Sequence, residues 1–214
     1  MSTATLDFLV QKFRLDLDQK QLPIAIPNFG RNQLAELTRE LGFKVGVEVG
    51  VAAGEYSEIV CKANPQMKLY GVDPWKPLQG YRDYTHQGTF DRLRRDAEAR
   101  LSSLPNYEFI RETSMEALNK FENNSLDFVY IDADHSFNHV VNDVHEWLKK
   151  IKPGGIISGH DYFKPGNNAR IHVVQAVNGY TNAWGIRPWF VLGNEANDEG
   201  LIRDEPRSWM WVKA

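Results

Sequence analysis

The sequence predicts an α/β domain with a doubly wound, mostly parallel seven-stranded sheet whose last strand is antiparallel. Short apolar runs alternate with helix-like segments from residue 45 to residue 178, which is typical of parallel strands joined by helices. Two strand candidates, 188–192 and 208–213, follow with no helix between them, which predicts an antiparallel final pair. The chain has 214 residues, 42% of them hydrophobic, which suits one domain with a buried core.

The first forty residues precede this alternating pattern. Apolar residues at helical spacing predict helices over 3–20 and 31–41. The apolar segment 21–27 contains two prolines that separate the helices, and it is interpreted as a lid or part of a dimer contact. Residues 1–42 are therefore expected to form a helical segment packed on a core of residues 43–214, in a single domain overall.

The alternating region then supplies the sheet and its crossover helices. The expected strands are 45–50, 69–73, 107–111, 127–132 and 155–159, and the expected helices are 55–63, 86–102, 115–121, 137–150 and 168–178. Ligands in such a sheet bind beyond the carboxyl ends of the strands, so the residues at these ends indicate function.

Charge and cysteine content exclude several functions. The net charge is −3, the sequence pI is about 6.1 and the chain has no basic arm or stripe, so nucleic acid is not expected as a main partner. Cys61 is the one cysteine, which favours a cytoplasmic location and is interpreted as a small core residue. No signal peptide and no membrane-spanning run are apparent, so no membrane association is expected.

Polar and ionisable residues stand at the end of each predicted strand. They are Glu48 and Gly50 after the first strand, Asp73 after the second, Ser114 after the third, Asp132, Asp134 and His135 after the fourth, and His160 and Asp161 after the fifth. Because parallel strands end at one edge of the sheet, these residues are expected to form one functional site.

The turn after the first strand indicates the type of ligand. Small residues from Gly50 to Gly54 allow a tight turn and close approach of the backbone to a ligand. The turn lacks the third glycine of the dinucleotide fingerprint, and the chain has no phosphate-binding Walker pattern. Glu48 would repel a pyrophosphate but suits the positive sulfonium and ammonium of S-adenosylmethionine.

These motifs resemble those of class I S-adenosylmethionine-dependent methyltransferases, in the branch that includes small-molecule and sugar O-methyltransferases. The matching stretches are EVGVAAG at 48–54, GVDPW at 71–75, LDFVYIDADH at 126–135, and residues 148–162. The departure is Ala52, where many members carry a glycine; alanine is nearly as small. The resemblance implies a Rossmann-like methyltransferase fold and methyl transfer to a small-molecule hydroxyl of a sugar or phenol.

The resemblance also implies the cofactor contacts. Residues at the first turn would border the methionine part, Asp73 would bind the ribose hydroxyls, Trp75 would lie against the adenine, and Ser114 with Met115 would line the adenine edge. The implied cofactor-binding set is Glu48, Gly50, Val51, Gly54, Asp73, Trp75, Ser114, Met115 and Asp132. Two structural alternatives stay open: Trp75 as a packing aromatic, and Ser114 as a helix N-cap.

A reaction centre is expected at the ends of the fourth and fifth strands. Carboxylates with an imidazole suit a divalent cation, and metal-dependent relatives imply Asp132, His160 and Asp161 as its ligands. His160 replaces an acid of the family, which favours Mn²⁺ over Mg²⁺. The expected catalytic residues are Asp132 and His135, with His135 as the base. A metal-free reaction with His135 or His160 as the base, and Asp134 as a cap of the next helix, are the alternatives.

The acceptor and the competing functions stay open. Aromatic stretches at 76–86, with Tyr81 and Tyr84, and at 161–170 are candidate walls of the acceptor site. An NAD-dependent oxidoreductase, a non-catalytic S-adenosylmethionine-binding module and an iron-dependent oxygenase are the alternative functions. A homo-oligomer formed through the N-terminal helices is a further hypothesis.

Overall fold

A computed structural model of the chain describes residues 3–77, 86–163, 171–194, 202, 204 and 206–214. The candidate acceptor walls lie mostly outside these residues, and Tyr81 and Tyr84 are among those outside. Among the helices of the described ranges, none has the length and apolar character needed to span a bilayer.

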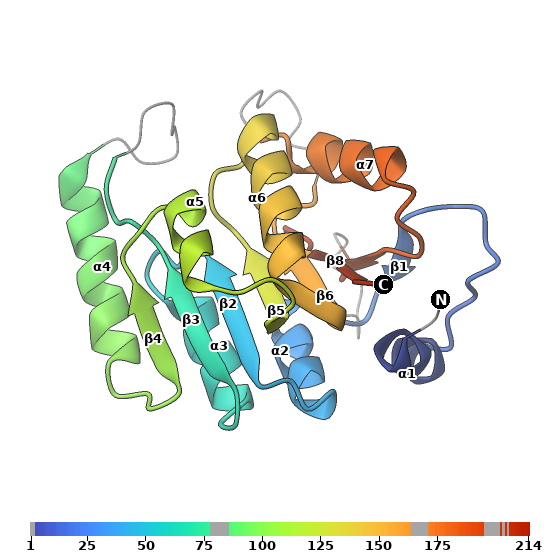
Figure 1. Cartoon of the computed structure of the whole chain (residues 1–214), viewed down its shortest axis with the longest axis horizontal. Helices are drawn as coiled ribbons and strands as arrows, with labels where there is room; N and C mark the ends of the chain where they lie inside the picture. The colour runs from blue at the N-terminus through green and yellow to red at the C-terminus, as the bar shows by residue number, and fades with distance from the viewer. Residues whose placement is uncertain (1–2, 78–85, 164–170, 195–201, 203, 205) are drawn as a thin grey trace.

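One eight-stranded sheet forms the centre of the molecule (Figure 1), in the order β1-β7-β8-β6-β5-β2-β3-β4. The strands are β1 Ile24–Ile26, β2 Val45–Val49, β3 Lys68–Val72, β4 Tyr107–Ile110, β5 Leu126–Ile131, β6 Ile151–Gly159, β7 Phe190–Leu192 and β8 Trp209–Val212. All pairs are parallel except those of β8, which lies antiparallel between β6 and β7. The predicted fold class is confirmed, with one strand more than the seven predicted.

The additional strand is β1, which lies in the segment expected to be a lid or dimer contact. Its three residues pair in parallel with β7, and Ile24 and Ile26 are buried. The segment is therefore an edge strand of the chain's own sheet and not a lid. Its part in a dimer contact remains a prediction. Three residues are too few to show a strand period, and only the neighbouring strand identifies them as one.

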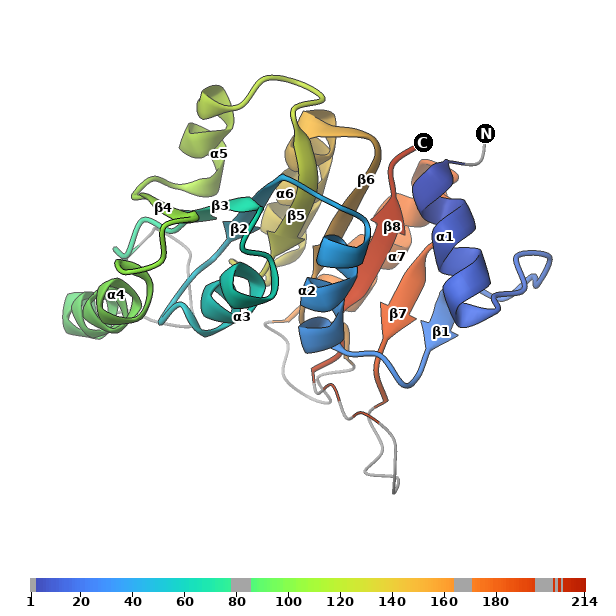
Figure 2. The same cartoon turned by 90° about the horizontal axis from the view of Figure 1, so that it is seen from below.

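Helices cover both faces of the sheet in two layers (Figure 2). They are α1 Ala4–Phe13, α2 Arg31–Glu40, α3 Glu55–Ala63 and α4 Gln87–Leu101 on one face, and α5 Ser114–Ala117 with its 3₁₀ continuation η1 Leu118–Lys120, α6 Phe137–Lys150 and α7 Val173–Ala183 on the other. Each layer encloses its own apolar cluster against the sheet.

Two predicted helices differ in their bounds. The helix expected over 3–20 ends at Phe13, because Arg14 adopts a left-handed conformation with φ of 52°. The helix expected over 168–178 begins at Val173 and continues to Ala183, and residues 168–170 lie outside the described part. These differences lie away from the strand ends that carry the predicted site.

Candidate active site

The predicted site residues meet where the chain changes direction across the sheet. β2 pairs with both β3 and β5, while α3 after β2 and α6 after β5 lie on opposite faces (Figure 2). This arrangement leaves a crevice beyond the strand ends. A cavity of about 770 Å³ opens there. Its lining includes Arg31, Glu48, Gly50, Val51, Asp73, Trp75, Ser114, Met115, Asp132, His135 and Asp143. Of the predicted cofactor residues, only Gly54 is not in the lining.

The first turn requires glycine at both of its ends. Gly50 has φ of +92°, and a Cβ there would lie 2.0 Å from the carbonyl oxygen of Asp132. Gly54 has φ of +79° and is the N-cap of α3, where a Cβ would lie 2.6 Å from Leu101. Ala52 adopts φ of +48°, a conformation that is unfavourable for alanine and that glycine adopts without strain. Gly54 therefore acts on the site by shaping the turn.

Glu48 lies beneath this turn and is 3% exposed. Its carboxylate accepts a hydrogen bond from the hydroxyl of Ser57. Burial raises the pKa of Glu48 to about 8, and the bond from Ser57 offsets only part of this effect. Without a ligand, the Glu48 side chain is therefore mostly neutral at pH 7. The side chain can attract a sulfonium only if it loses its proton when the cation binds.

Asp73 fastens the turn to the end of β3. Its Oδ2 accepts the backbone N–H groups of Val51 and Ala52 at 3.1 and 3.0 Å, and its Oδ1 accepts that of Trp75 at 2.7 Å. Burial raises the pKa of Asp73, although these three bonds favour the charged form. The carboxylate thus holds the turn in shape while it lines the cavity, and its contact with ribose hydroxyls remains a prediction.

Trp75 is 1% exposed, although it belongs to the cavity lining. Its Nε1 donates to the carbonyl oxygen of Ala52 at 2.9 Å, and its ring lies 6.1 Å from that of Phe109. This burial agrees with the alternative of a packing aromatic that supports the turn. Stacking of Trp75 on adenine remains a prediction.

Ser114 is held by two side chains of α6. Its hydroxyl donates to Asp143 and accepts the indole N–H of Trp147 at 2.8 Å. The helix N-cap is Thr113, whose side chain accepts the backbone N–H of Glu116, so the alternative of Ser114 as the cap was wrong. Met115 beside it is 40% exposed and offers an apolar surface to the cavity.

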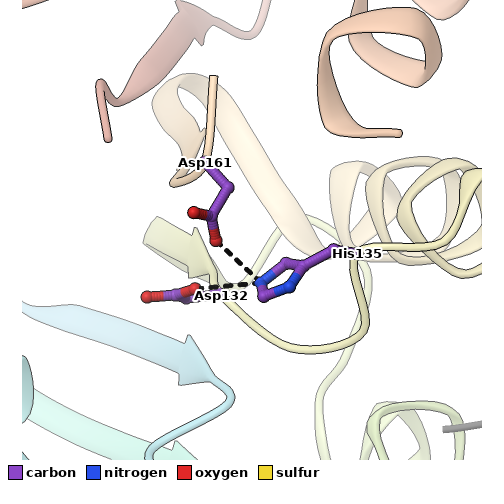
Figure 3. A group of neighbouring side chains, drawn as sticks. All are labelled: Asp132, His135 and Asp161. Atoms are coloured by element: carbon purple, nitrogen blue, oxygen red, sulfur yellow. Dashed lines mark hydrogen bonds and ion pairs between the residues drawn. The ribbon is translucent and has the colours of Figure 1, made fainter. Parts of the chain in front are cut away.

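Acids and histidines gather at the ends of β5 and β6, and Figure 3 shows three of them, Asp132, His135 and Asp161. His135 Nε2 lies 2.8 Å from Asp161 Oδ2 and 3.5 Å from Asp132 Oδ1. The Nδ1 of His160 lies 3.6 Å from Asp132 Oδ2 and 3.7 Å from Asp161 Oδ2. The residues predicted from two separate strand ends thus form one cluster. Asp134 instead accepts the backbone N–H of Ser136 at 2.8 Å. Ser136 is itself the N-cap of α6, so Asp134 supports the start of the helix without being its cap.

The electrostatics of the cluster favour charge on Asp161. Burial would raise the pKa of Asp161, but His135 and His160 beside it lower the pKa well below its ordinary value. Burial by itself would lower the pKa of His160. The hydrogen bond to Asp161 and the negative charges of Asp132 and Asp161 have the larger effect, so the pKa is raised. Asp161 is therefore the anion around which both imidazoles are arranged.

The cluster has the donor types that a divalent cation requires. Ligand atoms of Asp132, His135 and Asp161 lie within 4.8 Å of one another. His135 takes the place that the sequence gave to His160 in this set of three, with the Nδ1 of His160 close by. Two carboxylates with an imidazole suit Mn²⁺ or a similar first-row metal better than Mg²⁺.

Sequence reasoning missed several residues that line the cavity, among them the charged residues Asp143 and Arg31. Asp143 is 4% exposed, and burial raises its pKa to about 6. It lies on the buried face of α6 with Val140, Val144 and Trp147, and an acid in such an apolar stripe is a signal that the sequence does contain. Arg31 comes from α2, and no local pattern distinguishes it from a surface arginine.

The doubly wound sheet, the glycine turn and the strand-end acids around one cavity define a Rossmann-like enzyme with a ligand site at its switch point. More specifically, the chain belongs to a family of methyltransferase domains, whose family model matches residues 47–162. A 52-residue segment is also 33% identical to the uncharacterised protein y4gI of Sinorhizobium fredii (strain NBRC 101917 / NGR234). That match covers 24% of this chain and 6% of the curated relative.

Solved structures share the fold at low sequence identity. The O-methyltransferase from Bacillus cereus, in complex with S-adenosylhomocysteine, is 14% identical with a TM-score of 0.60, over 100% of this chain and 92% of that chain. The O-methyltransferase TomG from Streptomyces achromogenes, in complex with S-adenosylmethionine, is 16% identical with a TM-score of 0.57, over the same shares. The O-methyltransferase NovP is 14% identical with a TM-score of 0.58, over 86% and 78%.

Proposed function

We propose that this chain transfers the methyl group of S-adenosylmethionine to a hydroxyl oxygen of a small molecule. The observation that carries the proposal is the cavity, which is lined both by the turn from Glu48 to Ala53 and by Asp132 and His135. A cofactor on the turn would present its methyl group toward the acid–histidine cluster. The match to a methyltransferase family favours this function over an oxidoreductase.

The cofactor contacts proposed are those of the first turn and the next two strand ends. Glu48 would face the cationic end of the cofactor, and the backbone from Gly50 to Ala53 would approach it closely. Asp73 would accept hydrogen bonds from the ribose hydroxyls. The exposed side chain of Met115 would cover the adenine. B. cereus O-methyltransferase and TomG, solved with S-adenosyl compounds, support this choice of cofactor.

The chemistry requires the acceptor hydroxyl to lose a proton and to point at the methyl carbon. When Nε2 of His135 donates to Asp161, the other ring nitrogen is the basic one, and the Asp161 charge stabilises the imidazolium that forms. Asp132 Oδ1 lies 3.5 Å from the same nitrogen, Nε2, and would help Asp161 to orient the ring. A divalent cation held by Asp132, Asp161 and either His135 or His160 would supply a lowered hydroxyl pKa and a fixed geometry.

Titration calorimetry with S-adenosylmethionine and S-adenosylhomocysteine tests the cofactor, and absence of heat and of a thermal shift would reject it. Asp132→Ala should then abolish methyl transfer and change the affinity for S-adenosylhomocysteine by less than about threefold. If the variant loses methyl transfer and S-adenosylhomocysteine affinity together, Asp132 supports the structure of the site and has no separate role in catalysis. NADH fluorescence serves as the control for the oxidoreductase alternative.

The metal is tested with Mn²⁺ on the same protein. His135→Ala and His160→Ala variants, titrated with Mn²⁺, would show which imidazole is a ligand, since loss of that one should weaken binding most. Equal methyl transfer in EDTA and in Mn²⁺ would remove the cation from the proposal and leave His135 or His160 as the base alone.

The wider setting is proposed from the composition. Cys61 is buried, and burial raises its pKa to about 12, so it is an inert core thiol of the kind found in reduced compartments. A cytoplasmic location, a small-molecule acceptor and no role for nucleic acid agree with this and with the acidic net charge. Sedimentation analysis would determine whether the chain forms a homo-oligomer.

A further inference from the structure

Arg31 is the first residue of α2 and lines the same cavity as Glu48, whose pKa its charge lowers. Its backbone is fixed at both ends: its N–H donates to Asp204 Oδ2 at 3.2 Å, and its carbonyl oxygen accepts the hydroxyl of Tyr56 at 3.1 Å. The guanidinium carbon lies 5.7 Å from the centre of the Tyr56 ring. The start of the helix and an aromatic face thus hold this cation in place.

The guanidinium of Arg31 forms no ion pair with a carboxylate of the described residues. Of the carboxylates in the described ranges, none lies within 4.0 Å of the guanidinium. Asp204, which contacts the start of the helix, accepts the backbone N–H of Arg31. Yet Arg31 is half-buried, and its environment is acidic, with Asp132, Asp204 and Glu48 close enough to affect its charge or be affected by it. A half-buried guanidinium without a partner is suited to a ligand anion.

The amino-acid end of S-adenosylmethionine carries an ammonium and a carboxylate side by side. Glu48 and Arg31 both line the cavity and act on each other's charge, so they offer the complementary pair, an acid for the ammonium and a guanidinium for the carboxylate. Without Arg31, a carboxylate placed beside Glu48 and Asp132 would meet only repulsion. A guanidinium binds a carboxylate through two parallel hydrogen bonds.

We infer that Arg31 binds the α-carboxylate of the methionine part of the cofactor, a role that rests on the proposed function. The inference assigns to α2, which lies outside the stretch 47–162 matched by the family, a direct part in cofactor selection. It also explains why α2 begins at the cavity: the first turn of the helix delivers the cation there.

The test compares S-adenosylhomocysteine with its decarboxylated analogue, which keeps the ammonium and lacks the carboxylate. Arg31→Gln should weaken S-adenosylhomocysteine binding by about 10- to 100-fold, the range for a hydrogen bond to a charged group, and leave binding of the analogue within about twofold. Arg31→Lys should recover part of the lost S-adenosylhomocysteine affinity, because lysine restores the positive charge but not the two parallel hydrogen bonds of a guanidinium. Lys76→Gln is the matched control, since Lys76 lines the cavity beside Trp75 and should not distinguish the two ligands.

Equal losses for both ligands in Arg31→Gln, or no loss for either, would overturn the inference. Melting temperatures of the variants show whether the fold is intact, and Arg31→Lys provides the comparison if the glutamine variant does not fold. If the unmodified chain binds neither ligand, the proposed function itself fails, which is a different result from a chain that binds both without regard to Arg31.

Discussion

Binding of S-adenosylmethionine should release a proton from Glu48, and Glu48→Gln should abolish that release. The side chain is 3% exposed, and burial raises its pKa from 4.5 to about 8. At pH 7 roughly nine-tenths of the molecules therefore carry it in the neutral form. The ammonium and sulfonium of the cofactor favour the ionised form, so that binding should release about 0.9 proton.

Titration calorimetry at pH 7 in phosphate and in Tris measures this release, because the two buffers differ in enthalpy of ionisation. The difference between the observed enthalpies, divided by the difference between the buffers, gives the number of protons. The glutamine variant keeps an oxygen to accept the hydroxyl of Ser57, so it preserves the local structure. Equal enthalpies in the two buffers, or the same release from Glu48→Gln, would refute the reasoning.

The same group gives a stability prediction of definite sign. Between pH 4.5 and about 8 the folded protein holds a proton on Glu48 that the unfolded chain has lost. Stability from this group is therefore complete below pH 4.5 and declines by about 1.4 kcal/mol per unit as the pH rises, or about 5 kcal/mol over the window. Glu48→Gln should flatten the dependence of melting temperature on pH and be the more stable protein at pH 8.5; parallel curves would contradict this.

Substitutions at three further positions test the supports of the site. Gly50→Ala should destabilise the fold by about 3 kcal/mol or more, because residue 50 has a left-handed backbone conformation and the added Cβ would lie 2.0 Å from the carbonyl oxygen of Asp132. Urea unfolding measures the change, and a near-neutral result would refute the close approach. Ala52→Gly, at φ of +48°, should remain within about 1 kcal/mol of the parent in the same experiment. Asp143→Ala should cost about 1–3 kcal/mol by leaving the Ser114 hydroxyl without its acceptor, whereas Asp143→Asn should retain most of the stability, and equal losses would argue against this bond.

Local sequence was sufficient to predict the turn and the residues at the strand ends, because these features depend on residues that are close together in the chain. The glycine-bounded turn from Gly50 to Gly54 and the acid of Asp73 each follow a buried apolar run. A parallel sheet brings such ends to one edge whatever the order of its strands. The strand β1 was missed because its three residues are too few to show a period.

The sequence by itself determined the α/β class, the methyltransferase-like motifs and the gathering of Asp132, His135, His160 and Asp161. Only the tertiary structure decided how these groups pair, because pairing depends on distances between different strand ends: Asp161 lies against His135 at 2.8 Å, with His160 farther off. The tertiary structure also decided the protonation of Glu48, since burial cannot be read from neighbours in the chain. The location of Arg31 in the cavity likewise required the packing of α2 against the end of the sheet.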